Sequence, residues 1–357
     1  MNPERLLTTF LDLVQCDNPS GKETPVITYL RKALAALNLT VEQDKVSNLL
    51  IRLPGEGEPL LLNAHTDCVN PCINVRPVVA EGIIRSNGDT VLGADDLAGV
   101  AAILEALRSV LEAQKPHRAA EILFTTQEEI GLKGAFAFDY TKLRAKKGFT
   151  FDSTGKLGGI CLGSPSQTNF HALIQGQAAH AGVAPEQGIS AIQVAAAAIN
   201  AMDLGRLDFE TTANIGLIRG GEATNIVPPH VELWGEARSH DPQKLAQQVA
   251  AMEKALQQAA AAYGAKATIK FTASYESYQL SEEEAVVQQA KAAFRALGIE
   301  PYTFLSGGGS DVNVFRRRGL QVVNLALGYT QIHSVNEQIA ITDLEQIARL
   351  AEVFLSL

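Results

Sequence analysis

The chain has 357 residues, 46% of them hydrophobic and 19% charged, and its 30 Lys and Arg against 39 Asp and Glu give a net charge of −9. This composition excludes an intrinsically disordered protein, and the lack of a basic excess argues against nucleic acid as a partner. Four cysteines are too few for a disulfide scaffold, no apolar run is long enough for a membrane span, and the first residues lack a secretory signal. We therefore expect a cytoplasmic globular protein of two domains, with no membrane partner.

The first half of the chain predicts strands that alternate with helices. Helices are predicted at 6–14, 24–36 and 94–112, and strands at 48–53, 60–64, 121–126 and 149–152. The strand at 60–64 is almost wholly apolar, as in a strand that is buried on both faces. This alternation favours an α/β domain with a central mixed, largely parallel sheet sandwiched by helices.

The middle of the chain has a different pattern. Strands are predicted at 170–175, 212–218, 231–238 and 267–272, with helices at 188–202 and 242–263, the latter capped by Asp241. The order β-α-β-β-α-β is that of a ferredoxin-like module. After it the earlier pattern returns, with helices at 281–297 and 342–357 around a strand at 322–327. We therefore expect a discontinuous α/β domain of residues 1–165 and 274–357, with an inserted ferredoxin-like α+β domain, a lid or dimerisation domain, at 166–273.

Polar residues that can carry chemistry follow the first buried strand. His65 and Asp67 come directly after it and, two apart in an extended segment, point the same way. A carboxylate beside an imidazole sets its tautomer and raises its basicity, as around many metal sites. Taken alone, the pair is more often part of an ordinary solvated loop.

Two pairs of acids stand at the ends of later elements. Asp95 and Asp96 stand at the start of a predicted helix. A helix needs only one capping residue, so capping explains one of the two acids but not both. Glu128 and Glu129 follow a strand, and adjacent carboxylates repel each other unless a cation or a proton resolves the repulsion. We interpret them as one metal ligand and one residue that transfers protons, with a solvated charge pair as the alternative.

Asp152 ends another strand, and His333 follows a turn. A single Asp or His is usually structural, so these two gain weight only from the set that they complete. The set contains two histidines and several carboxylates, each at a strand end or a turn of the α/β domain. Ends of this kind gather at one edge of an open α/β sheet.

With these motifs in this order, the sequence resembles the co-catalytic zinc exopeptidases and amidohydrolases, and within them the peptidase T (tripeptide aminopeptidase) branch. Carboxypeptidase G, acetylornithine deacetylase and succinyl-diaminopimelate desuccinylase belong to the same family. Seven short motifs carry the resemblance: Asn63-Ala64-His65-Thr66-Asp67, Leu92-Gly93-Ala94-Asp95-Asp96, Thr126-Gln127-Glu128-Glu129-Ile130-Gly131, Ala178-Ala179-His180-Ala181-Gly182, Ala223-Thr224-Asn225-Ile226-Val227-Pro228, Glu236-Ala237-Arg238-Ser239 and His333-Ser334-Val335-Asn336-Glu337. Each alone is weak, but seven in order with an insertion of suitable size make a chance match improbable.

The resemblance implies two divalent metal ions, zinc in the first place with cobalt or manganese as alternatives. It assigns the residues as follows: His65 and Asp152 to one ion, Glu129 and His333 to the other, Asp95 as the bridge, Asp67 to orient His65, Glu128 as the general base for a metal-bridging hydroxide, and His180, Asn225 and Arg238 to bind substrate. Two Zn²⁺ ions carry four positive charges, which three carboxylates and one hydroxide balance, as a partly buried site requires.

The implied activity is metal-dependent hydrolysis of amide bonds in small peptides, by an aminopeptidase on dipeptides and tripeptides that forms a homodimer through the inserted domain. An N-acyl-amino-acid deacylase or a carboxypeptidase on the same scaffold is the alternative, because fold does not specify substrate. A non-catalytic binding relative is disfavoured, since no predicted ligand is missing. A serine or cysteine hydrolase is disfavoured because the chain has no Gly-x-Ser-x-Gly motif and no supported Cys–His pair.

Overall fold

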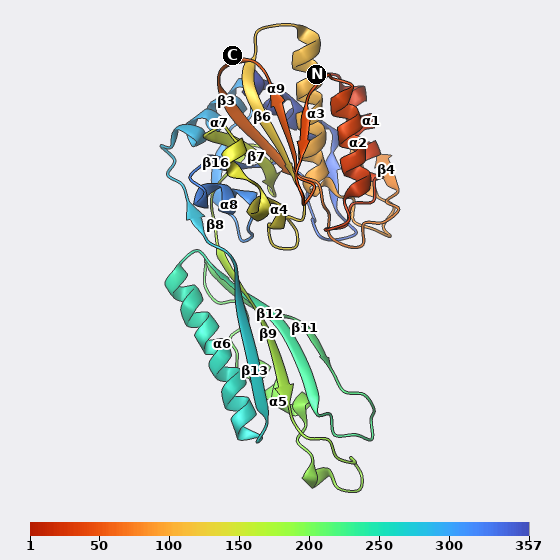
Figure 1. Cartoon of the computed structure of the whole chain (residues 1–357), viewed down its shortest axis with the longest axis vertical. Helices are drawn as coiled ribbons and strands as arrows, with labels where there is room; N and C mark the ends of the chain where they lie inside the picture. The colour runs from red at the N-terminus through yellow and green to blue at the C-terminus, as the bar shows by residue number, and fades with distance from the viewer. Residues whose placement is uncertain (357) are drawn as a thin grey trace. The chain divides into compact units, whose positions relative to one another are not determined.

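The computed structural model describes residues 1–356, which form two compact units (Figure 1). The first unit contains Met1–Leu162, Gln279–Ser306 and the described part of Ser310–Leu357. The second contains Gly163–Tyr278 and Gly307–Gly309. Among residues 1–356, no helix is both long enough and apolar enough to cross a bilayer.

The first unit is built on a nine-stranded sheet with the order β1-β2-β6-β3-β7-β16-β8-β14, in which β15 pairs with β8. Its strands are β1 (Val41–Gln43), β2 (Leu49–Leu53), β3 (Glu56–His65), β6 (Arg118–Thr125), β7 (Lys147–Ser153), β8 (Gly159–Ser164), β14 (Tyr278–Gln279), β15 (Tyr302–Leu305) and β16 (Gln321–Ala326). The four central strands β6, β3, β7 and β16 pair in parallel, while β2 and β8 pair antiparallel on either side. The predicted mixed, largely parallel sheet is therefore confirmed.

Side chains alternate along the strands of this sheet, so each strand has residues on both faces. Helices cover both faces. Phe149 and Phe151 of β7 face α9 (Ile341–Leu355), where Phe354 stacks on Phe149 with ring centroids 3.7 Å apart. Thr150, between them, points to the other face and donates to Oδ1 of Asn63 at 3.0 Å. On the Phe149 side, α9 contacts α1 (Pro3–Val14) and α3 (Ala94–Ala113), which also contact each other.

The helices of the first unit mostly follow the predicted ones. They are α1 (Pro3–Val14), α2 (Thr24–Ala35), α3 (Ala94–Ala113), α4 (Lys133–Ala137), α7 (Ala285–Ala296), α8 (Asp311–Arg317) and α9 (Ile341–Leu355), with a 3₁₀ turn η1 (Tyr140–Lys142). The last residue of the helix predicted at 342–357 lies outside the described residues. The short α4 and α8 were not predicted, nor was the three-stranded sheet of β4 (Pro77–Ala80), β5 (Ile83–Ser86) and β17 (Gln338–Ala340). Such short elements depend on their neighbours more than on local periodicity.

The second unit has a five-stranded antiparallel sheet with the order β10-β11-β12-β9-β13. Its elements are β9 (Ser166–Gln175), η2 (Pro185–Gln187), α5 (Ala191–Asn200), β10 (Gly205–Arg206), β11 (Thr211–Gly220), β12 (His230–Ser239), α6 (Pro242–Ala262) and β13 (Lys266–Tyr275). Apart from the short β10, this is the predicted β-α-β-β-α-β order, so the ferredoxin-like module is confirmed.

Two helix starts in the second unit show how local capping sets the boundaries. Asp241 caps α6 as predicted, its carboxylate accepting the N–H of Gln243 at 2.7 Å. Helix α5 begins later than predicted because Ser190 caps it, accepting the N–H of Gln193 at 3.3 Å. Both helices pack on one face of the sheet, against buried residues such as Phe170 and Leu233.

Candidate metal centre

Three neighbouring parallel strands bring the first candidate residues to one edge of the central sheet. Strand β3 ends at His65, β6 ends at Thr125 just before Glu128 and Glu129, and β7 carries Asp152 near its end. His65 and Thr125 are direct partners in the register of β3 and β6. Because parallel strands end at the same edge, side chains that are far apart in the sequence converge there.

Asp95 lies between the two predicted histidine ligands. Its Oδ1 is 3.2 Å from Nε2 of His65, and its Oδ2 is 3.6 Å from Nε2 of His333. Asp95 and Asp96 have non-helical backbone angles, and Gly93 before them has φ +82°, so the chain turns sharply as it enters α3. Neither acid is a helix cap, so that alternative is wrong for both.

Each histidine has a second carboxylate beside it. Oδ1 of Asp152 lies 3.6 Å from Nε2 of His65, and Oε1 of Glu129 lies 3.0 Å from Nε2 of His333. Ligand atoms of His65, Asp95 and Asp152 lie within 4.8 Å of one another, and so do those of Asp95, Glu129 and His333. The structure therefore brings the five predicted ligands together as two groups that share Asp95.

This donor set fits two divalent cations. Imidazole nitrogens and carboxylate oxygens are ligands that zinc binds, and cobalt and manganese accept them too. Nδ1 of His65 lies 3.0 Å from the carbonyl oxygen of Asp67. Since a carbonyl only accepts, Nδ1 carries the hydrogen, and in the neutral ring the lone pair of Nε2 faces Asp95 and Asp152.

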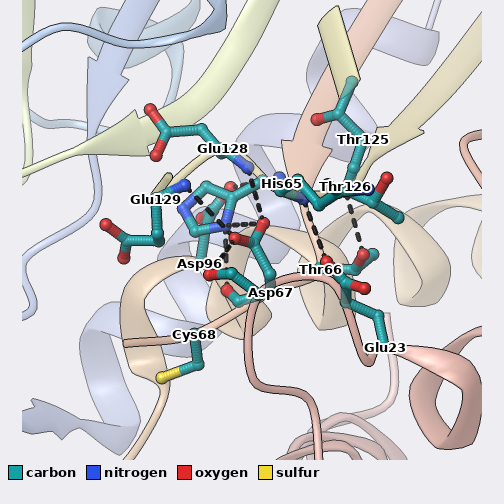
Figure 2. A network of polar contacts seen from close by, with 12 residues as sticks. Glu23, His65, Thr66, Asp67, Cys68, Asp96, Thr125, Thr126, Glu128 and Glu129 are labelled. Carbon is teal, nitrogen blue, oxygen red and sulfur yellow. Dashed lines mark hydrogen bonds and ion pairs between the residues drawn. The ribbon is translucent and has the colours of Figure 1, made fainter. Parts of the chain in front are cut away.

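Asp67 contacts other groups in addition to His65, its predicted partner (Figure 2). Its Oδ1 is 3.4 Å from Nδ1 of His65 and accepts the backbone N–H of Glu128 at 2.9 Å. Its Oδ2 accepts the backbone N–H of Glu129 at 3.2 Å and the hydroxyl of Ser20 at 2.7 Å. In Figure 2 the backbone nitrogens of both glutamates point to Asp67 while their carboxylates point away. Asp67 therefore holds the loop that carries the glutamates as well as the imidazole.

The titration of the histidines follows from the carboxylates around them. Hydrogen bonds to Asp95 and Glu129 raise the pKa of His333 to about 10. Burial opposes the charged form of His65, but hydrogen bonds to Asp152, Asp67 and Asp95 outweigh it and raise its pKa well above the ordinary value. Without a metal ion, protons on the histidines thus balance the carboxylates, and a cation bound there takes over that role.

The carboxyl groups of the centre titrate differently from one another. Burial, with the carboxylates of Asp95 and Asp311 nearby, raises the pKa of Asp152 to about 7. Burial, with the charges of Asp152 and Glu129 nearby, raises the pKa of Glu128 well above its ordinary value. For Asp95 burial is outweighed by hydrogen bonds to His333 and His65, which lower its pKa. Carboxyl groups pushed apart in this way are suited to different roles.

The three predicted substrate-binding residues all lie in the second unit. His180 and Asn225 are exposed and belong to neighbouring segments, since Ala181 donates its N–H to the carbonyl of Asn225 at 2.9 Å. Nδ1 of His180 accepts the N–H groups of Gly182 and Val183, each at 3.2 Å. Its Nε2 therefore carries the ring hydrogen and is a donor.

Arg238, on β12, makes a two-point hydrogen bond to Glu236. Its Nε donates to Oε1 at 2.8 Å, and an Nη donates to Oε2 at 2.9 Å. The guanidinium is half-buried rather than fully solvated. Arg238 is thus paired with a neighbouring carboxylate and partly buried.

Sequence reasoning missed two buried groups that contact Asp95. The hydroxyl of Tyr329 donates to Oδ1 of Asp95 at 3.3 Å, and Tyr329 is 1% exposed. Glu337 accepts the backbone N–H of Asp95 at 2.9 Å and is also 1% exposed. Both stand within four residues of His333 in the sequence, and this nearness to a predicted ligand is the feature that could have predicted them.

Comparisons with known proteins cover the whole chain. Residues 162–264 match the M20 family described as the peptidase dimerisation domain, and residues 76–154 match the family described as M42 glutamyl aminopeptidase. The solved structure of a tripeptidase from Staphylococcus aureus subsp. aureus Mu50 is 40% identical, covers 99% of this chain and 98% of its own, and superposes with a TM-score of 0.91.

Two further relatives have the same extent. The structure of aminopeptidase PepT from Bacillus cereus ATCC 10987 is 40% identical, covers 99% of this chain and 98% of its own, and has a TM-score of 0.85. The uncharacterized protein YqjE of Bacillus subtilis strain 168 is 40% identical over 360 residues, which are 98% of this chain and 97% of that protein. The similarity therefore includes both units and not one alone.

Proposed function

The chain belongs to the peptidase T-like branch of the M20 peptidases, and on that premise we propose that it is a metal-dependent aminopeptidase that acts on dipeptides and tripeptides. The observation that carries the proposal is the position of Asp95, whose two carboxylate oxygens face Nε2 of His65 and Nε2 of His333. A carboxylate shared in this way suits two cations, which in two-metal sites stand about 3.5–4 Å apart.

We assign the proton transfers to Glu128. When bound, the two ions supply Lewis acidity, which polarises the scissile carbonyl and acidifies water. Glu128 stands beside Glu129 and is not one of the five residues assigned to the ions, so its carboxylate is available to take the proton of the attacking water. The same carboxyl group then returns the proton to the leaving amine. Asp67 keeps Glu128 in place through the 2.9 Å hydrogen bond to its backbone N–H.

We assign the contacts to the peptide itself to His180, Asn225 and Arg238. The Nε2–H of His180 is a suitable donor to the oxyanion that forms on the scissile carbonyl. Arg238 is suited to a terminal carboxylate, because a guanidinium binds a carboxylate through two parallel hydrogen bonds. Its present two-point bond to Glu236 has that form, and a peptide carboxylate would replace Glu236 as the acceptor.

Zinc is the metal that we propose for both positions. The two groups contain two imidazoles and three carboxylates in all, which zinc binds readily. Cobalt and manganese are the alternatives, since they take the same nitrogen and oxygen ligands. Metal analysis of the purified protein, followed by removal and replacement of each ion in turn, tests this assignment.

We propose that the protein is a homodimer formed through the second unit. The match to the peptidase dimerisation domain covers most of that unit. Large apolar side chains are exposed on it, including Val183 at 77%, Phe209 at 79% and Ile218 at 50%. Contact with a second copy of the chain would remove this apolar surface from water. Light scattering of the protein after gel filtration measures the oligomeric state, and a monomer at micromolar concentration contradicts the proposal.

A cytoplasmic location completes the proposal. All four cysteines have free thiols, as is usual in a reducing compartment. Fractionation of the source cells with an antibody against the protein tests it.

Four matched substrates test the proposed activity: a free tripeptide, the same peptide N-acetylated, the same peptide C-amidated, and an N-acyl amino acid. We expect the metal-loaded protein to release N-terminal residues only from peptides with a free N-terminus, with the products identified by mass. Cleavage of the acylated substrates alone contradicts the proposal and indicates a deacylase or carboxypeptidase. If none of the four is cleaved although both metals are bound, the proposed peptidase activity is wrong.

A further inference from the structure

Glu337 is a buried acid that the proposed mechanism does not use. It is 1% exposed, and both oxygens of its carboxylate accept backbone hydrogen bonds from the turn before α3. Oε2 accepts the N–H of Gly93 at 2.7 Å, and Oε1 accepts the N–H of Asp95 at 2.9 Å. A carboxylate without such partners is costly to bury, so these two bonds are what keeps Glu337 inside the protein.

The N–H groups of Gly93 and Asp95 stand at the start of α3, where backbone N–H groups have no partner within the helix. Gly93 has φ +82°, a left-handed conformation that glycine adopts without strain. Asp95 has φ −82° and ψ 102°, which is extended and not helical. The N–H groups of a helix start need partners from outside the helix. The carboxylate of Glu337 accepts the N–H groups of both Gly93 and Asp95. It therefore determines the direction in which the Asp95 side chain points.

The same carboxylate is tied to the second histidine. Glu337 stands four residues after His333 in one loop, which Thr330 and Gln338 close by hydrogen bonds of 2.9 and 3.1 Å in both directions. Within the loop, the N–H of Glu337 donates to the carbonyl of Ser334 at 3.1 Å. Glu337 thus links a loop that carries one ligand, His333, to a turn that carries another, Asp95, across 242 residues of sequence.

We propose that Glu337 is a positioning residue that holds Asp95 between His65 and His333, so that the two metal ions bind as a pair. The inference rests on the proposed function in assuming that these residues bind metal. Its consequence for the reaction is indirect, because Glu337 acts on Asp95 through the backbone and touches neither peptide nor metal. If the Asp95 carboxylate rotates away from one of the two histidines, it can still bind one ion but no longer binds the other.

The test compares two buried glutamates that accept backbone N–H groups. Glu121, also 1% exposed, accepts the N–H groups of Arg144 and Ala145 on one oxygen, Oε2, each at 2.8 Å, and is not in either metal group. Glu337→Gln replaces one of two accepting oxygens by an amide nitrogen, which opposes one of the two N–H groups. In Glu121→Gln the amide oxygen still accepts both N–H groups, so this variant controls for the loss of a buried negative charge. The metal-free wild type and both variants are titrated with Zn²⁺ alone, against a competing chelator.

We expect wild type and Glu121→Gln to bind two Zn²⁺ per chain with equal affinities. For Glu337→Gln we expect one of the two to bind about 10- to 100-fold more weakly, as is usual when a group that orients a ligand is lost. With peptide as substrate, kcat of this variant falls by a similar factor while KM changes little, because the groups that bind the peptide are untouched. Glu337→Asp keeps the charge on a shorter side chain, and we expect its zinc affinity to lie between those of wild type and Glu337→Gln. If Glu337→Gln does not fold, Glu337→Asp is measured in its place.

Two results overturn the inference. One is that Glu337→Gln binds both zinc ions as tightly as wild type does. The other is that Glu121→Gln loses zinc to the same extent, since the loss of any buried negative charge would then have the effect. A wild type that binds two zinc ions but cleaves no peptide disproves the proposed function alone, because zinc binding still tests Glu337.

Discussion

The carboxylate of Asp67 and the backbone N–H of Glu128 form a 2.9 Å hydrogen bond that joins the end of β3 to the loop after β6. The other oxygen of Asp67 holds Glu129 in the same way at 3.2 Å. One buried acid therefore places an imidazole, a candidate base and a candidate ligand relative to one another. Its contribution to activity is then larger than that of a group that only orients His65.

Replacing Asp67 by Asn tests this relationship. The amide keeps the size of the side chain but presents a donor to one of the two backbone N–H groups, so the loop with Glu128 and Glu129 shifts. We expect kcat to fall about 10- to 100-fold or more, with a smaller loss of metal affinity. Ser20→Ala removes one hydrogen bond to Asp67 and leaves both backbone bonds, so it is the matched control and should cost less than tenfold. Equal losses in the two variants would contradict the clamp.

Glu128→Gln separates proton transfer from metal binding. The amide has the shape of the acid but cannot take a proton, so we expect kcat to fall about 10²- to 10⁴-fold, the usual contribution of general acid–base catalysis. Both metals should remain bound, as measured by metal analysis after gel filtration. Glu129→Gln is the contrast, in which metal should be lost. Unchanged turnover in Glu128→Gln would remove this residue from the mechanism.

Metal uptake should release protons, because His333 is protonated in the metal-free protein. Hydrogen bonds to Asp95 and Glu129 raise its pKa to about 10, so at pH 8 the ring carries a proton that it must lose before Nε2 binds an ion. The apparent zinc affinity should therefore rise with pH between 6.5 and 8. Calorimetric titrations in buffers of different ionisation enthalpy count the protons. His333→Ala should release fewer of them, and an equal number in both proteins would contradict this prediction.

His180→Ala should affect catalysis without affecting the metals. Nδ1 of His180 accepts two backbone N–H groups, which leaves Nε2–H free to donate to an oxyanion. Loss of one such donor costs about 10²- to 10³-fold in kcat. We expect the metal content and the melting temperature to stay at wild-type values, since the ring is exposed. A change in KM alone would assign His180 to substrate binding instead.

The stacking of Phe149 and Phe354 predicts a large effect on stability. Both rings are buried, their planes are 12° apart, and they join β7 to the last helix, α9. Phe354→Ala should lower the free energy of unfolding by about 3–5 kcal/mol, as is typical of a truncated core phenylalanine. Val79→Ala, at a side chain of the first unit that is 45% exposed, should change it by less than about 0.5 kcal/mol. Urea unfolding followed by circular dichroism measures both, and similar values for the two variants would contradict the assignment of the core.

The sequence by itself determined the architecture and pointed to the site. The run 60–64 is apolar except for Asn63, which favours a strand buried on both faces of a parallel sheet, and β3 is one. Polar residues directly after such strands come together because parallel strands end at one edge. His65, Glu129 and Asp152 are therefore candidates from their places in the chain, and the resemblance to the zinc exopeptidases assigns them to metal ions.

Only the tertiary structure decided how these residues are held. Asp95 reads as a helix cap in the sequence, whereas in the fold it lies between two histidines because Gly93 turns the chain and Glu337 accepts its N–H. Asp67 binds backbone, and so does Glu337. Every residue except proline carries the same backbone N–H, so no sequence pattern marks which ones a distant carboxylate will reach. These partners are chosen when strands and loops pack, and for that reason the supporting contacts of the site are visible only in three dimensions.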